Sequence, residues 1–271
     1  MMKAVILAAG YGERLRKGIE SLKKEDPERF SDIKDSVEGK AKPMVEIAGK
    51  PVVQHIVENI ENTSVDEIFI VTNHLYFNQF DEWKRAYDSS IPIRLVDDNT
   101  KTNETRLGAV NDLILVLKEK DIDDDVLVIA GDNLLKFDLN DMISFFEKKD
   151  ATTLMVYPES DLEKIKRSAC VSFDEQNLVI GFEEKPSEPK SEWICPAIYI
   201  YDHDTIRLIK EMRFDEDKKD LIGNIPLLLY NKIRIYVYPM HEKIRFDLGT
   251  IDDLEKANAY FQLRADEGKG R

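Results

Sequence analysis

The sequence has little cysteine and no long apolar run. Its 271 residues include two cysteines, Cys170 and Cys195, too few for a disulfide framework. Without further ligands nearby, two buried thiols are favoured over a metal site. No stretch approaches the roughly 18 apolar residues that span a membrane, so we expect no membrane partner. The short apolar N-terminus runs directly into charged residues, which favours a strand over a signal peptide. Together these features predict a cytoplasmic protein.

Excess positive charge is also absent. The formal net charge is −14, which argues against nucleic acid as the partner because a phosphate backbone is bound by a basic surface. A small anionic ligand needs only a local group of cations, and one is available near the N-terminus. Its members are Arg14, Arg16, Lys17, Lys40 and Lys42. A nucleotide therefore remains possible as a ligand where nucleic acid does not.

Strand and helix patterns alternate through the first half of the chain. Short apolar runs predict buried parallel strands, and apolar side chains at helical spacing predict helices between them. Strands are expected at 5–8, 68–72, 93–96 and 126–130, and helices at 52–60, 77–87, 107–118 and 139–147. After Ala151 we expect strands at 152–157, 169–173, 179–183, 197–201 and 233–239, and helices at 205–211, 222–231 and 252–264. This order predicts an α/β fold with a doubly wound, mixed and mostly parallel, Rossmann-like sheet and an appended second half.

The first motif is a loop with two glycines at the end of the first strand. It reads Ala8-Ala9-Gly10-Tyr11-Gly12-Glu13-Arg14-Leu15. Glycines let backbone N–H groups approach phosphate oxygens, and Arg14 adds a forked charge that suits phosphate. A dinucleotide fingerprint would need glycine where Leu15 stands and an acidic residue where Asn73 stands, which disfavours a nicotinamide oxidoreductase. A Walker A motif is absent, so a triphosphate loop and a simple tight turn remain.

Four later motifs place charges beside apolar segments. They are Lys42-Pro43-Met44, Gly131-Asp132-Asn133, Glu184-Lys185-Pro186 and Asp247-Leu248-Gly249-Thr250. The proline after Lys42 predicts an extended backbone that fixes the direction of this lysine. Asp132 follows a strand and should lie at the carboxyl edge of the sheet, where its carboxylate suits Mg²⁺. Taken singly, each motif also fits a surface lysine or a turn carboxylate.

One segment between these motifs is unusually charged. Of the 24 residues from 17 to 40, 13 are charged. It is either a solvated helical insertion or a mobile lid over the phosphate site, because it lies between the glycine loop and Lys42.

The five motifs in this order resemble those of the sugar-phosphate nucleotidyltransferase family, which includes glucose-1-phosphate thymidylyltransferases. The family patterns look like Ala-Ala-Gly-x-Gly-Thr-Arg-Leu, Lys-Pro-Met, Gly-Asp-Asn, Glu-Lys-Pro and Asp-x-Gly-Thr. The resemblance runs from Ala4 to about Ala257. It implies a single nucleotidyltransferase domain over 1–271. Residues 1–131 would be the nucleotide-binding half with the insertion 17–40, residues 132–250 the acceptor-binding half, and residues 251–271 a C-terminal helix and tail.

The resemblance also implies an activity and roles for residues. A nucleoside triphosphate and a sugar 1-phosphate would give a nucleotide sugar and pyrophosphate with the help of Mg²⁺. The implied catalytic residues are Arg14, Lys42, Asp132 and Lys185. The implied substrate-binding residues are Ala9, Gly10, Gly12, Arg106, Gly108, Gly131 and Glu184, and the implied metal ligands are Asp132 and Asp247. The attacking acceptor phosphate is already ionised, so no general base is required, and a homo-oligomer is expected because relatives commonly assemble.

The sequence departs from the family pattern at both substrates. Glu13 replaces a threonine, so we expect its carboxylate to point away from the triphosphate or to pair with a lysine of the insertion. Arg106 stands where a glycine is typical, which leaves the nucleobase open and leaves Arg106 to bond a base or phosphate or to lie on the surface. Ala169 and Ala197 stand where glycines are typical, and their methyl groups should make the usual hexose 1-phosphates fit poorly.

Two alternatives remain open. One is a cytidylyltransferase that acts on a phospho-alcohol or inositol phosphate. The other is a catalytically silent nucleotide-sugar-binding regulatory protein, against which the retained Arg14, Lys42, Asp132, Lys185 and Asp247 count.

Overall fold

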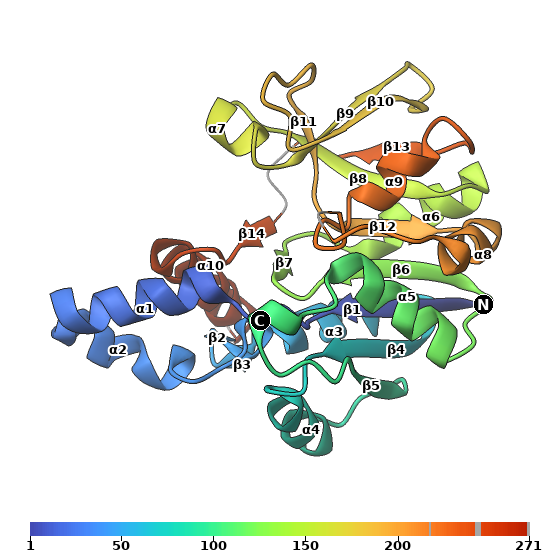
Figure 1. Cartoon of the computed structure of the whole chain (residues 1–271). Helices are drawn as coiled ribbons and strands as arrows, with labels where there is room; N and C mark the ends of the chain where they lie inside the picture. The colour runs from blue at the N-terminus through green and yellow to red at the C-terminus, as the bar shows by residue number, and fades with distance from the viewer. Residues whose placement is uncertain (217, 242–244, 270–271) are drawn as a thin grey trace.

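Among the residues that the computed structural model describes, 1–216, 218–241 and 245–269, ten strands form one mixed sheet (Figure 1). Its core is parallel. β1 (Met2–Leu7) lies between β6 (Asp125–Ala130) and β4 (Val65–Thr72), and β5 (Ile93–Asp97) lies beyond β4. Each strand in this core has a short apolar run that both faces of a covered parallel sheet can bury. The predicted α/β fold with a doubly wound parallel core is confirmed.

The second half of the chain continues the sheet with reversed strands. β12 (Ile198–Tyr201) pairs antiparallel with β6, and β8 (Thr153–Pro158) pairs antiparallel with β12. Beyond β8 lie β11 (Trp193–Cys195), β9 (Ala169–Phe173) and β10 (Val179–Glu184), while β13 (Tyr236–Pro239) pairs parallel with β8. The sequence patterns predicted all of these strands except β11, which is too short to show an alternating pattern. The change of direction between β6 and β12 makes the sheet mixed.

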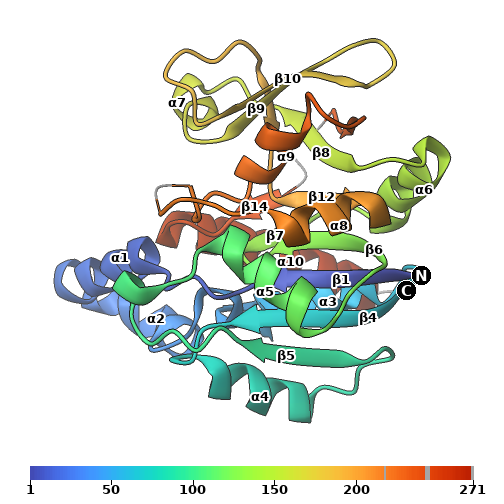
Figure 2. The same ribbon diagram turned by 45° about the vertical axis from the view of Figure 1, so that its right-hand side comes forward.

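Helices cover both faces of the parallel core. In β1, Ala4 and Ile6 belong to one apolar cluster and Val5 belongs to the other, because successive side chains of a strand point to opposite faces. The first cluster includes residues of α3 (Val52–Ile60), α4 (Phe77–Ala86), α6 (Leu139–Lys149) and α10 (Ile251–Lys269). The second includes residues of α5 (Ala109–Glu119), α8 (His203–Glu211) and α9 (Asn224–Leu229), and Figure 2 shows α5 and α8 on the opposite side of the strands from α3 and α10. In the described part of the chain, no helix is both long and apolar enough to cross a membrane.

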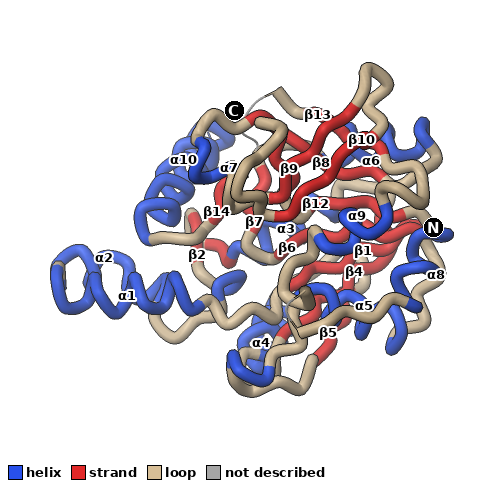
Figure 3. The backbone as a smooth tube through the Cα atoms, turned by 45° about the horizontal axis from the view of Figure 1, so that its top comes forward, coloured by secondary structure: helices blue, strands red, loops and turns tan. Residues whose placement is uncertain are grey.

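The charged insertion forms two packed helices. α1 (Glu13–Glu25) and α2 (Pro27–Val37) form a hairpin that projects from the body of the molecule (Figure 3). Leu22, Phe30 and Val37 are buried along this hairpin, so its few apolar side chains supply a seam while the charges face outward. The turn between the helices is fixed by Asp26, whose carboxylate accepts a hydrogen bond from the Arg29 N–H. The segment is therefore a helical insertion, and its action as a lid stays a prediction.

An ion cluster ties the hairpin to the C-terminal helix. The Arg29 guanidinium donates hydrogen bonds of 2.7 Å to Glu255 and to Asp252 of α10. Two carboxylates on successive turns of α10 thus hold one arginine of α2, which restrains the first turn of α2 against the C-terminal helix.

Short elements complete the structure around the carboxyl edge of the sheet. They are β2 (Glu46–Ile47), β3 (Lys50–Pro51), β7 (Asn133–Leu135), α7 (Leu162–Ile165), β14 (Arg245–Asp247) and the 3₁₀ turns Lys42–Met44 and Asn103–Thr105. The extended backbone expected at Lys42 is wrong. A 2.8 Å hydrogen bond from the Met44 N–H to the Ala41 carbonyl closes a 3₁₀ turn there, so local hydrogen bonding overrides the preference that proline imposes on the residue before it.

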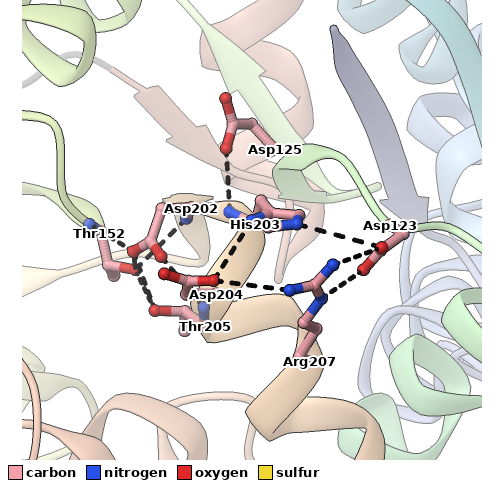
Figure 4. A network of polar contacts seen from close by, with 8 residues as sticks. All are labelled: Asp123, Asp125, Thr152, Asp202, His203, Asp204, Thr205 and Arg207. Carbon is pink, nitrogen blue, oxygen red and sulfur yellow. Dashed lines mark hydrogen bonds and ion pairs between the residues drawn. The ribbon is translucent and has the colours of Figure 1, made fainter.

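A polar network at the opposite edge of the sheet fixes the start of α8 (Figure 4). Asp202 caps this helix, and its carboxylate accepts hydrogen bonds from the N–H and hydroxyl groups of both Thr152 and Thr205 at 2.6 to 3.0 Å. The His203 N–H donates to Asp125 at 2.9 Å, which ties α8 to the beginning of β6. Burial by itself raises the pKa of Asp202, but the hydrogen bonds from Thr152 and Thr205 overcome it and leave this pKa below its usual value.

Asp202→Ala should lower the free energy of unfolding by about 1–3 kcal/mol, because a helix cap and four hydrogen bonds are lost. A carboxyl group with a depressed folded-state pKa stabilises the protein above its unfolded pKa of about 4 and loses this effect as the pH falls through the lower folded value. The difference between wild type and variant should therefore shrink in acid. Urea denaturation at neutral and acidic pH measures it.

The exposed neighbour Asp204 provides the matched control, since Asp204→Ala should change stability by less than about 0.5 kcal/mol. Equal losses from both variants would show that the Asp202 network does not hold α8.

Candidate active site

Two adjoining cavities lie at the carboxyl ends of β1 and β6. The larger, of about 520 Å³, is lined by Ala9, Gly10, Gly12, Arg14, Lys42, Arg106, Gly108, Asp132 and Lys185, among others. The smaller, of about 220 Å³, is lined by Glu184 and Asp247 and shares Arg14 and Asp132 with the larger. Every site residue predicted from the sequence therefore lines one of the two cavities, with the exception of Gly131. Ligands in the two cavities would meet beside Arg14 and Asp132.

The glycine loop presents backbone to the larger cavity. A Cβ atom at Gly10 would meet no atom within 4 Å, so the position opens onto free space. Gly12 has φ 62°, in the left-handed region that favours glycine, and α1 begins directly after it without a side-chain cap. The first N–H groups of a helix lack partners within the helix and attract anions. Arg14 lies in this first turn, so dipole and side chain both favour a phosphate here.

Gly131 has a packing role in the structure. Its N–H donates a 2.8 Å hydrogen bond to the Leu7 carbonyl. A Cβ there would lie 3.1 Å from the Leu7 oxygen, 3.1 Å from Pro43 and 3.2 Å from Ala8. Glycine thus allows the end of β6 to lie tightly against the glycine loop, which positions the next residue, Asp132. Direct contact between Gly131 and a substrate stays a prediction.

Lys42, Asp132 and Asp247 converge at the junction of the two cavities. The Lys42 Nζ lies 2.6 Å from Asp132 Oδ2 and 3.5 Å from Asp247 Oδ1. The two aspartates are far apart in the sequence, but β7 and β14 pair in a register that places Asp247 opposite Asn133, next to Asp132. Both carboxylates therefore already surround one positive charge.

This pair of carboxylates could hold a divalent cation. In the described part of the chain, no three His, Cys, Asp or Glu side chains form a metal cluster. Mg²⁺ commonly takes only one or two protein carboxylates together with substrate phosphates. A two-carboxylate site beside a glycine loop and a helix N-terminus fits that ion better than zinc, which prefers four nitrogen or sulfur ligands.

The smaller cavity contains a partly buried carboxyl group. Burial raises the pKa of Glu184, and the positive charge of Lys185 opposes this. Lys185 has φ 49°, which a non-glycine residue adopts at some cost in free energy, and its N–H bonds the Ser168 carbonyl at 3.1 Å. Gly223 packs against this group, since a Cβ there would lie 1.8 Å from Glu184 Oε2. The sequence patterns gave no sign of Gly223 because they placed it inside a helix.

Arg106 lines the larger cavity with its guanidinium already bonded. It donates to both carboxylate oxygens of Asp220 at 2.9 and 2.5 Å and to the Asn103 carbonyl at 2.7 Å. The hydrogen bonds that Arg106 donates to Asp220 raise the pKa of Arg106. Asp220 lines both cavities, but it was missed because its charged surroundings in the sequence resemble a solvated loop.

Two further expectations concern groups near the substrates. Glu13 lines the larger cavity, and its negative charge helps to raise the pKa of Arg106, so it lies closer to the site than expected. The histidines lie elsewhere, and none is among the described residues that line either cavity. His55, for example, packs away from the site, where burial lowers its pKa and its Nε2 bonds the Ile47 carbonyl.

The fold and the two cavities define an α/β protein with a glycine loop at a helix N-terminus, converging carboxylates and an adjoining second pocket. A family model described as nucleotidyl transferase matches residues 37–263, and the chain belongs to this family. The resemblance noted from the five motifs is thereby confirmed.

Known proteins of the family are similar to the chain over most of its length. The bifunctional protein GlmU of Methanocaldococcus jannaschii is 28% identical over 215 residues, which cover 79% of this chain and 43% of that protein. A glucose-1-phosphate adenylyltransferase of Clostridium novyi is 26% identical, over 95% of this chain and 66% of the relative. The chain therefore spans between about two fifths and two thirds of these curated relatives.

A solved structure of an apo UDP-glucose pyrophosphorylase has the same fold. It aligns with a TM-score of 0.74 and 18% identity, over 97% of this chain and 100% of the other.

Gly108→Ala should destabilise the protein and disturb the larger cavity. Gly108 has φ 87°, and a Cβ there would lie 2.6 Å from the Lys219 carbonyl oxygen, which accepts the Val110 N–H hydrogen bond at the start of α5. Backbone strain costs about 1–2 kcal/mol, and the clash should add about 1–3 kcal/mol. Denaturant unfolding of the variant measures the sum of these two costs as a loss of unfolding free energy.

Gly49→Ala separates the backbone strain from the steric clash. Gly49 has φ 77°, so an alanine there is strained, but its Cβ would meet nothing within 4 Å. If both variants lose the same unfolding free energy, the clash with the Lys219 carbonyl does not contribute to the loss.

Proposed function

We propose that this chain joins a nucleoside triphosphate to a sugar 1-phosphate, which gives a nucleotide sugar and releases pyrophosphate. The observation that carries the proposal is the junction of two cavities at Arg14 and Asp132, where Lys42 lies between Asp132 and Asp247. The larger cavity has the size and the phosphate-binding loop for a triphosphate, and the smaller adjoins it where a second phosphate would have to approach.

The proposed reaction is a displacement at the α-phosphorus of the triphosphate. An ionised oxygen of the acceptor phosphate forms the new bond to this phosphorus, and the bond to the bridging oxygen of the β-phosphate breaks. Pyrophosphate leaves with the electron pair. The attacking oxygen carries no proton at neutral pH, so the absence of histidine among the described lining residues presents no difficulty.

The protein groups would act by position and charge. Arg14 and the N-terminus of α1 would hold the triphosphate, and Lys42 would counter negative charge at the reacting phosphates. Lys185 would approach the acceptor phosphate and Glu184 its hydroxyls. Fixed donors of this kind stabilise charge that develops in the transition state without reorganising.

We propose Mg²⁺ as the cofactor, held by Asp132 and Asp247. When bound, this ion would neutralise charge on the phosphate oxygens. The two carboxylates suit it because they already face a shared positive charge, that of Lys42.

The same two cavities support a separation of the chain into a nucleotide-binding part and an acceptor-binding part. Most residues around the larger cavity precede residue 132, and most residues around the smaller cavity follow it. This supports residues 1–131 as the nucleotide-binding half, 132–250 as the acceptor-binding half and 251–271 as an added helix and tail.

An assay of pyrophosphate release tests the activity. It is run with Mg²⁺ on a panel of nucleoside triphosphates and phosphorylated acceptors. Asp132→Asn should lower kcat at least about 100-fold with the best pair, because one charged group at the junction is lost. Asp141→Asn on the exposed face of α6 serves as the control and should leave kcat unchanged. Near-normal turnover by Asp132→Asn, or no product with any pair, would contradict the proposal.

The acceptor is expected to differ from the usual hexose 1-phosphates. Ala169 and Ala197 both line the smaller cavity, and their methyl groups occupy space that glycine would leave free. Ala169→Gly should therefore raise kcat/KM for glucose 1-phosphate by roughly tenfold or more, the effect of one methyl group on a fitted pocket.

Ala151→Gly, a buried alanine outside both cavities, is the control for the general effect of an added glycine. High turnover of glucose 1-phosphate by the wild type would show that the two methyl groups do not exclude it.

A further inference from the structure

The larger cavity contains one buried carboxyl group that the proposed reaction leaves unused. Asp112 lies in the first turn of α5, lines the cavity and is 5% exposed. Its Oδ1 is buried without a hydrogen-bond partner among the described residues. Buried polar atoms are almost always bonded, so a carboxyl group that lines a cavity and has an orphaned oxygen is able to accept a further hydrogen bond.

Nearby cations do not satisfy this group. Arg106 bonds Asp220, and the Lys219 ammonium lies 2.5 Å from Glu216. Lys219 still acts on Asp112 through its charge, but it forms its ion pair elsewhere.

The other groups that face Asp112 are acidic or already bonded. Asp98 and Asp220 act on it by repulsion. The Asp98 carboxylate accepts hydrogen bonds from Thr100, whose hydroxyl also contacts the Tyr11 hydroxyl at 2.9 Å. Burial, reinforced by these two carboxylates, raises the pKa of Asp112 well above its usual value.

The charges of the cavity also separate the parts of a nucleotide. Arg14, Lys42 and the N-terminus of α1 attract the triphosphate. The Asp112 carboxyl group would not attract it, and the charge of Arg106, which also lines the cavity, is already paired with Asp220. An uncharged nucleobase is the part of the ligand that can lie against this side of the cavity.

We propose that Asp112 hydrogen-bonds the nucleobase and selects a base with an exocyclic amino group over uracil and thymine. This inference rests on the proposed function. It specifies that the larger cavity takes a nucleoside triphosphate whose base carries an amino group. An amino group supplies an N–H donor for the carboxyl group of Asp112, which lines the cavity. The negative charge of Asp98 favours such hydrogens, whereas uracil and thymine present a single N–H between two carbonyl oxygens, which this charge disfavours.

Isothermal calorimetry tests this inference. It measures the binding of ATP, CTP, GTP, UTP and dTTP to the whole chain in the presence of Mg²⁺. The wild type should bind at least one amino-bearing nucleotide more tightly than UTP and dTTP. Asp112→Leu should weaken that preferred nucleotide roughly tenfold or more and leave UTP within about threefold. Asp112→Asn should restore much of the affinity, because the amide oxygen accepts the same hydrogen bond.

Asn111→Ala is the matched control on the same helix, since Asn111 does not line the cavity and bonds the Leu107 carbonyl. Its nucleotide preference should equal that of the wild type. Thermal unfolding of each variant separates a loss of fold from a loss of recognition.

The outcomes distinguish this inference from the proposed function. If the wild type binds nucleotides but prefers UTP or dTTP, or if Asp112→Leu changes stability without changing the preference, the role of Asp112 is refuted and the transferase remains. If the wild type binds no nucleoside triphosphate, the proposed function itself fails.

Discussion

The contact of one ammonium with two carboxylates joins the parts of this structure. Lys42 reaches Asp132 and Asp247 from the segment after the helical insertion, from the end of β6 and from β14. Each carboxylate would repel the other if the positive charge were removed. The glycine loop, the tight packing at Gly131 and the pairing of β7 with β14 all serve to bring these three side chains together, and both cavities open beside them.

The larger cavity has cations near one end and carboxyl groups near the other. A chain with a net charge of −14 keeps arginine and lysine beside the glycine loop and places carboxyl groups toward α5. The Arg106–Asp220 pair ties the loop before α5 to the segment before α9. A ligand with an anionic end and a neutral end therefore has one favourable orientation.

Much of the fold could be predicted because its signals are local. The apolar runs of β1, β4, β5 and β6 and the helical spacing in α3 and α5 appear in the order of the chain, and the structure has them within a few residues of the expected bounds. The short strands β7, β11 and β14 could not be predicted in this way. Two or three residues carry no periodicity, and such strands exist only because a partner strand lies beside them.

The sequence by itself determined the parallel core, the family and a set of motif residues that nearly all line the two cavities, since these depend on local patterns and ordered motifs. Tertiary structure alone decided how they act together. The contact of Asp247 with Lys42 depends on the register of β7 and β14, and the pairing of Arg106 with Asp220 depends on segments far apart in the chain. The orphaned oxygen of Asp112 is likewise a property of its surroundings, because only packing determines which buried polar group lacks a partner.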